Sequence, residues 1–188
     1  MTRESVNVAV LGATGAVGET LLTVLKERNV PIGTLYPLAS ARSAGKTVTF
    51  KGQTLTVLDV AQFDFAKADI GLFSAGGSVS ADYAPKAAQA GCVVIDNTSQ
   101  FRYEKGIPLV VPEVNPEAIS GYKTRNIIAN PNCSTIQMLV ALKPIYDAVG
   151  IERINVATYQ AVSGAGKSAI EALLQQTEAL LKGQEPEL

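Results

Sequence analysis

Histidine is absent from all 188 residues, so the side chain that most often serves as a general base near neutral pH is missing from this chain. Tryptophan is also absent, and only two cysteines occur, Cys92 and Cys133. They stand 41 positions apart and form no C-x-x-C pair, which argues against a disulfide scaffold and against a zinc site. We therefore expect a reducing, cytoplasmic compartment and no metal centre.

An excess of charge is lacking as well. The net charge is −1, from 16 basic and 17 acidic residues without a basic block, so electrostatic binding to nucleic acid or to an acidic membrane is not expected. No apolar run approaches the roughly 18 residues of a membrane helix, and the first residues lack the apolar region of a signal peptide. A hydrophobic fraction of 47% suits an α/β protein with buried parallel strands.

A glycine-rich turn follows the first apolar run. Residues 6–11 predict a buried strand, and the apolar spacing after Val17 predicts a helix that ends near Arg28. A strand, a G-x-x-G-x-x-G turn and an amphipathic helix in this order are typical of dinucleotide binding, in which the pyrophosphate lies on the helix N-terminus. A purely structural turn is the alternative. The candidate cofactor residues here are Gly12, Thr14, Gly15, Ala16 and Val17.

The predicted second strand, near residues 34–38, ends without an acidic residue. An NAD site usually places Asp or Glu there to bind the adenine ribose. This chain has instead Ser40, Ala41, Arg42 and Ser43, whose hydroxyls and guanidinium suit a 2′-phosphate. The loop therefore favours NADP, with a solvated polar loop as the alternative.

Strand and helix patterns alternate from residue 6 to about 130. A short apolar strand at 70–73 runs into a loop of small residues that contains Ser74 and Gly76, at a strand end where open α/β sheets bind ligands. The alternation predicts an α/β fold with a Rossmann-like, doubly wound parallel sheet over residues 1–130. Residues 131–188 predict a largely buried helix, a strand at 153–162 and a second helix, which together are too few for a complete domain.

Cys133 stands between a strand end at Asn130-Pro131 and the start of a predicted helix. Unpaired backbone N–H groups and the helix dipole favour a thiolate at such a position, so Cys133 is either a nucleophile or a core cysteine at a turn. Arg102 lies in a long polar connection over residues 97–125. It is a candidate clamp for a phosphate or carboxylate, with an ordinary surface arginine as the alternative. Cys92 precedes an apolar strand and is predicted to be a core residue.

Gly166-Lys167-Ser168 imitates a P-loop between a strand and a helix. The pattern requires a further glycine at position 161, where this chain has Ala161, so we do not expect a nucleotide triphosphatase.

Taken together, the motifs resemble the aspartate-semialdehyde dehydrogenase family, and the resemblance covers the whole chain in order. The segments that carry it are Gly12–Gly18, Ser74–Gly77, Asp96–Ser99, Val111–Asn115, Asn130–Thr135 and Gln160–Gly166.

The resemblance implies NADPH-dependent reduction of L-aspartyl 4-phosphate to aspartate semialdehyde and phosphate, or the reverse, in the biosynthesis of lysine, methionine, threonine and isoleucine. It implies that Cys133 is the nucleophile that forms a thioester and that Gln160 orients the substrate. It further implies that Arg102 and Asn132 bind phosphate and that Ser163 and Gly164 join the cofactor site.

The chain departs from the family in length. Family members are much longer, and their acid/base histidine, their carboxylate-binding arginine and most of the catalytic and dimerisation domain fall in the part without a counterpart here. We therefore expect a portion of an enzyme that forms a homodimer when complete. The main rival interpretation is a non-catalytic NADP-sensing Rossmann protein, and a third is an interaction module.

Overall fold

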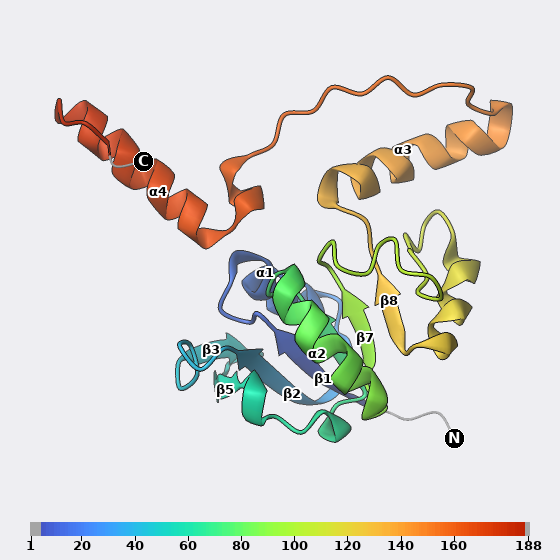
Figure 1. Cartoon of the computed structure of the whole chain (residues 1–188), viewed down its shortest axis with the longest axis horizontal. Helices are drawn as coiled ribbons and strands as arrows, with labels where there is room; N and C mark the ends of the chain where they lie inside the picture. Colours follow the sequence, from blue (N-terminus) through green and yellow to red (C-terminus); the bar gives the residue numbers. More distant parts are fainter. Residues whose placement is uncertain (1–4, 187–188) are drawn as a thin grey trace.

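The computed structural model describes residues 5–186, and its centre is a six-stranded sheet with the order β5-β2-β1-β6-β7-β8 (Figure 1). All neighbouring strands in this sheet are parallel. The Rossmann-like sheet predicted from the sequence is therefore confirmed. The strands are β1 Val6–Leu11, β2 Ile32–Ala39, β5 Leu58–Asp59, β6 Ile70–Phe73, β7 Val93–Asp96 and β8 Ile127–Ala129.

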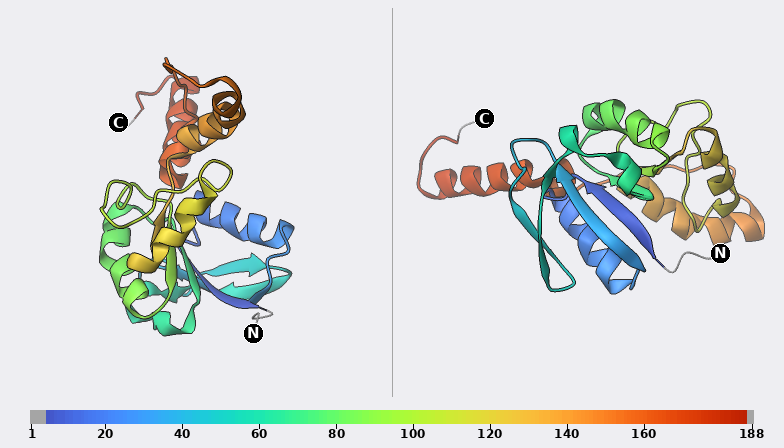
Figure 2. Two further views of the ribbon diagram at one scale, coloured as in Figure 1. Left: turned by 90° about the vertical axis from the view of Figure 1, so that its right-hand side faces the viewer. Right: turned by 90° about the horizontal axis from the view of Figure 1, so that it is seen from below.

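Two helices cover opposite faces of this sheet. Helix α1 (Ala16–Glu27) connects β1 to β2, and helix α2 (Gly77–Gln89) connects β6 to β7. Alternate residues of β1 point to opposite faces. One face packs in a core that includes Leu22 of α1, and the other packs in a core that includes Ala84 of α2. An antiparallel hairpin, β3 (Thr47–Phe50) and β4 (Gln53–Thr56), lies beside α1 (Figure 2).

The connections between strands contain short 3-10 helices. Two of them, η1 (Val60–Gln62) and η2 (Phe65–Lys67), lie between β5 and β6. The long connection before β8 contains a third, η3 (Pro116–Thr124), and a parallel bridge between Leu109 and Ala129. Because this connection also buries Phe101, Ile107 and Val111, it packs against the sheet edge rather than extending into solvent.

Beyond β8 the chain leaves the sheet. Helix α3 (Cys133–Val149), a 3-10 turn η4 (Val162–Ala165) and helix α4 (Lys167–Leu181) project away from it, and a long arch joins α3 to η4 (Figure 1). No helix in residues 5–186 combines the length and apolar character needed to cross a membrane.

Two expectations for this region are wrong. Helix α3 has no buried residue, and the exposed fraction of Val149 reaches 81%. The apolar face is present, but no sheet in the described part of the chain covers it. Residues 153–162 form no strand, since a strand needs a hydrogen-bonded partner and none of the described strands lies beside them.

Candidate active site

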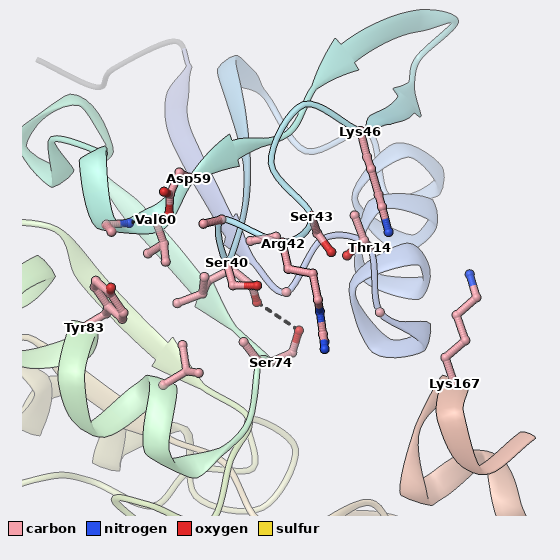
Figure 3. Close-up of a pocket in the computed structure, with 18 of the residues that line it drawn as sticks. Thr14, Ser40, Arg42, Ser43, Lys46, Asp59, Val60, Ser74, Tyr83 and Lys167 are labelled. Atoms are coloured by element: carbon pink, nitrogen blue, oxygen red, sulfur yellow. Dashed lines mark hydrogen bonds between the residues drawn. The ribbon is translucent and has the colours of Figure 1, made fainter. Parts of the chain in front are cut away.

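A cavity of about 1040 Å³ lies at the carboxyl ends of β1, β2 and β6, over the start of α1 (Figure 3). The glycine turn forms its floor. Gly12 has a φ of +91°, and a Cβ there would sit 3.1 Å from the backbone nitrogen of Ala75. A Cβ at Gly18 would collide with the carbonyl oxygen of Gly12. The turn after β1 therefore packs directly against helix α1 and against the loop after β6 because Gly12 and Gly18 lack side chains.

Hydrogen bonds hold the turn between its neighbouring strands. The backbone nitrogen of Gly12 donates to the carbonyl oxygen of Leu38 at the end of β2 over 2.9 Å. On the other side, Ser74 after β6 donates to the carbonyl of Leu11 through both its backbone nitrogen (2.9 Å) and its hydroxyl (3.2 Å). The ends of β1, β2 and β6 are thus fixed together around the cavity.

Most of the predicted cofactor residues line this cavity, although three groups do not. Gly76 caps the N-terminus of α2, and Ala16 and Val17 lie in the first turn of α1. Ser163 and Gly164 lie in η4. The predicted residues that line the cavity are Gly12, Thr14, Gly15, Ser40, Ala41, Arg42, Ser43 and Ser74.

The loop after β2 contributes two of the cations that line the cavity, Arg42 and Lys46. The carbonyl of Ser40 accepts from the backbone nitrogens of Ser43 (2.8 Å) and Ala44 (3.1 Å), which folds the loop into a tight turn. Arg42 projects from this turn, and Lys46 extends toward the same space (Figure 3). Two cations and two hydroxyls therefore surround the position after β2 where an NAD site would place a carboxylate.

Several residues of the cavity wall are not predicted by the sequence patterns. Except for Lys46, they come from elements outside the glycine turn and the loop after β2. The Gly-Lys-Ser run at 166–168, with a lysine and a hydroxyl at a helix start, offered a local signal. Lys167 from α4 also forms an ion pair with Glu19 of α1. The missed residues include Lys46, Asp59, Val60, Tyr83, Lys167, Ser168 and Glu171.

Cys133 is the first residue of α3, directly after the turn that follows β8. The side-chain oxygen of Asn132 caps the helix by accepting from the backbone nitrogen of Thr135 over 2.9 Å. Cys133 is exposed, whereas Cys92 is fully buried as predicted. Burial, with a smaller contribution from the charge of Asp69, raises the pKa of the Cys92 thiol to about 12. Of the two cysteines, Cys133 is therefore the accessible one.

Arg102 lies against the Cys133 turn. Its Nε donates to the carbonyl oxygen of Asn130 over 3.0 Å, and its Nη2 donates to the carbonyl oxygen of Asn97 over 3.3 Å. The tertiary structure thus brings together Arg102, from the long connection, and the Asn130–Cys133 segment, as a shared site requires.

Gln160 lies elsewhere, on the exposed arch between α3 and η4. Its side chain rests against Gly164, where an added Cβ would collide with the Gln160 amide. Within residues 5–186 no hydrogen bond links Gln160 to Cys133. The structure therefore groups Gln160 with Ser163 and Gly164, apart from Cys133 and Arg102.

Comparison with known proteins gives matches along both regions of the chain. Residues 7–122 match the NAD-binding domain of semialdehyde dehydrogenases, and residues 142–188 match their dimerisation domain. An aspartate-semialdehyde dehydrogenase of Legionella pneumophila is 70% identical over 177 residues, which are 94% of this chain and 51% of that protein. The chain spans about half the length of the curated relatives it matches.

Solved structures give the same picture. Aspartate semialdehyde dehydrogenase II of Vibrio cholerae, complexed with ASA, is 64% identical, with a TM-score of 0.96 over 99% of this chain and 55% of that one. The Candida albicans enzyme, solved with NADP, is 30% identical, with a TM-score of 0.66 over 78% of this chain and 48% of that one. The chain therefore belongs to the semialdehyde dehydrogenase family, within which it resembles the aspartate-semialdehyde dehydrogenases.

Proposed function

We propose that this chain supplies the cofactor site and the nucleophile of an NADP-dependent aspartate-semialdehyde dehydrogenase. The reaction is the reversible reductive dephosphorylation of L-aspartyl 4-phosphate to L-aspartate 4-semialdehyde. The observation that carries the proposal is the placement of Arg102 against the turn that leads into the exposed Cys133. A thiol at a helix start, three residues after the carbonyl to which a guanidinium is hydrogen-bonded, suits attack on an acyl phosphate.

The cavity over the glycine turn fits a dinucleotide with a 2′-phosphate. Its volume of about 1040 Å³ lies at the upper end of the range for small-molecule sites, and the glycine turn has no Cβ where a pyrophosphate would approach. Arg42 and Lys46, with the hydroxyls of Ser40 and Ser43, would hold the 2′-phosphate. When bound, NADPH supplies the hydride for the reduction of the acyl group.

Cys133 and its neighbours act on the substrate. The Cys133 sulfur forms a bond to the C4 carbonyl carbon, the bond from that carbon to the phosphate oxygen breaks, and inorganic phosphate leaves. Arg102 and Asn132 bind the phosphate, and backbone N–H groups at the start of α3 stabilise the oxyanion. Gln160, which lies on the arch apart from Cys133 within residues 5–186, would orient the substrate in the complete enzyme. After reduction the sulfur leaves as a thiolate, so the nucleophile is regenerated.

The two regions of the chain have different roles in this proposal. Residues 1–130 form the NADP-binding domain, with Ala16, Val17 and Gly76 beside the cavity residues. Residues 131–188 begin the catalytic and dimerisation domain, in which Ser163 and Gly164 approach the cofactor. The exposed apolar face of α3 would be covered in a complete homodimer. We expect residues 1–188 alone to bind NADP weakly and not to turn over.

Substitution of the nucleophile tests the proposal. In the native protein, Cys133→Ala is expected to abolish phosphate-dependent oxidation of aspartate semialdehyde, measured as NADPH absorbance, while NADP binding is retained. The matched control is Cys92→Ala, which removes the buried thiol and should leave activity in the fraction that folds. Full activity in Cys133→Ala would refute Cys133 as the nucleophile. Absence of activity in the wild-type protein, with NADP binding equal in wild type and variant, would favour a non-catalytic NADP-binding protein instead.

Two further measurements test the expectation that residues 1–188 alone do not turn over. The intact mass of the native protein shows whether it continues beyond Leu188, and a steady-state assay of residues 1–188 shows whether they suffice. Near-normal turnover by these residues alone would disprove the proposed division of roles.

A further inference from the structure

Asp96 is a fully buried carboxylate for which the proposed reaction has no use. It is the last residue of β7, and its two carboxylate oxygens accept from two hydroxyls. Ser80 of α2 donates to Oδ1 over 2.7 Å, and Thr98 donates to Oδ2 over 2.7 Å. A buried carboxylate is unfavourable unless its oxygens are hydrogen-bonded, so this group holds both hydroxyls firmly. It therefore ties the loop after β7 to helix α2.

The next residue, Asn97, transmits this fixed position to the Cys133 turn. Its backbone nitrogen donates to the carbonyl of Phe73 over 2.9 Å, which holds it at the end of the sheet. Its side-chain oxygen accepts from the Asn130 side-chain nitrogen over 2.7 Å, and the backbone nitrogen of Asn130 donates to the Asp96 carbonyl over 3.1 Å. Two bonds therefore join residues 96–97 to the residue three positions before Cys133.

Arg102 is held by both partners of this connection. Its Nε and Nη2 donate to the carbonyls of Asn130 and Asn97 respectively, which uses two of the five guanidinium N–H donors. In the described part of the chain no carboxylate forms an ion pair with Arg102. The Arg102 side chain is half-buried, and two hydrogen bonds fix its orientation. Its positive charge has no carboxylate partner in the described residues, and three of its N–H donors remain for an anion.

We propose that Asp96 and Asn97 are positioning residues that fix the Arg102 guanidinium for an oxyanion beside Cys133. An arginine recognises an oxyanion through a planar fork of donors, so the orientation of the plane decides the affinity. The carbonyls of Asn97 and Asn130 set this plane, and the buried carboxylate holds the backbone that carries them. The identification of the anion as phosphate rests on the proposed function.

Two substitutions at Thr98 separate this role from a general effect on folding. Thr98→Val keeps the shape and removes the hydroxyl that donates to Asp96, whereas Thr98→Ser keeps the donor. Asn97→Ala is the second test, because the Asn97 side chain is exposed and its loss is tolerated more readily by the fold. The readout is protection of Cys133 from iodoacetamide by inorganic phosphate, followed by mass spectrometry in the native protein. Cys92 is buried and does not interfere.

We expect the phosphate concentration that gives half protection to rise about tenfold in Thr98→Val and in Asn97→Ala, and by less than about twofold in Thr98→Ser. The dissociation constant for NADP should be unchanged in all three. Wild-type phosphate affinity in folded Thr98→Val and Asn97→Ala would overturn the inference. A parallel loss of NADP affinity would overturn the inference as well, because it would show that the substitutions destabilise the whole domain and not the position of Arg102 alone.

The same experiments distinguish failure of the positioning role from failure of the proposed reaction. A wild-type protein that does not oxidise aspartate semialdehyde, but whose phosphate protection weakens in the variants, would refute the reaction and support the positioning role. A wild-type protein that turns over, but shows no phosphate protection of Cys133, would support the reaction and refute the positioning role.

Discussion

The ammonium of Lys167 lies 3.2 Å from Oε1 of Glu19, and this ion pair joins the start of α4 to α1 across 148 positions of the sequence. Both side chains are more than half exposed. Lys167 also lines the cavity over the glycine turn (Figure 3). The second region of the chain therefore contributes to the wall of this cavity.

Loss of Lys167 should affect cofactor binding more than stability. Exposed ion pairs contribute about 0–1 kcal/mol, so Lys167→Ala is expected to change the free energy of unfolding in urea by no more than that. NADP affinity should fall, and more so at low salt, because a cation leaves the cavity. The matched control is Lys182→Ala, which breaks the similarly exposed pair with Glu178 on the same helix and should leave NADP affinity unchanged. Equal NADP affinities in both variants would contradict this prediction.

Arg42 should decide the preference for NADP. A charge-assisted hydrogen bond to a 2′-phosphate contributes about 1.5–3 kcal/mol, so Arg42→Ala should weaken NADP binding by about tenfold or more. NAD lacks the 2′-phosphate, and its affinity should therefore stay the same. Titration of both cofactors against the variant and against Arg28→Ala, an exposed arginine just after α1, measures the effect. A parallel loss of NAD affinity would show that Arg42 acts through the loop instead.

Gly18→Ala should destabilise the fold although alanine favours helices. In an ordinary helix this exchange stabilises by about 0.5–1 kcal/mol, but here the new Cβ would collide with the carbonyl oxygen of Gly12. Gly77→Ala is the matched control, since the nearest atom to its added Cβ is 3.8 Å away. Chemical denaturation should show a loss for Gly18→Ala and no loss for Gly77→Ala. Similar stabilities would mean that the turn and α1 are packed less closely than the structure indicates.

The raised pKa of Cys92 predicts a loss of stability at alkaline pH. The folded protein keeps the thiol protonated until its pKa of about 12, whereas the unfolded chain releases the proton from its ordinary value of 9.0. Below pH 9 the stabilisation is fully present, and between pH 9 and 12 it is lost, by up to about 1.4 kcal/mol per pH unit. Cys92→Ala should therefore show a shallower fall in unfolding free energy over this window. An identical slope in both proteins would contradict the assignment.

Local patterns predicted the nucleotide-binding half of the fold well. The bounds of β1 and β6 agree with the predicted strands at 6–11 and 70–73. Both are short and mainly apolar segments followed by small residues, and this local composition is enough to predict a strand in the middle of a parallel sheet. Cys92 was correctly placed in the core for the same reason. The approach of α1 to the turn is also a local feature, because a Cβ at Gly18 would meet the carbonyl of Gly12, six positions away.

The predictions failed where an element depends on a distant partner. The apolar pattern of α3 predicted a buried helix, but burial requires a second surface, and none in residues 5–186 covers Ile145 or Val149. Residues 153–162 have the composition of a strand and form none, because backbone pairing cannot be satisfied by one segment alone. The apolar spacing of a helix shows which of its faces can be buried. It does not show whether another part of the chain covers that face.

The sequence by itself determined the class of fold, the glycine turn between β1 and α1 and the cysteine at a helix start, because each depends on residues that are neighbours in the chain. Only the tertiary structure placed Lys46 and Lys167 in one cavity and seated Arg102 on the carbonyl of Asn130, 28 positions away. Such contacts depend on where the sheet brings the ends of its strands. They follow from packing of the whole domain, which no local pattern encodes.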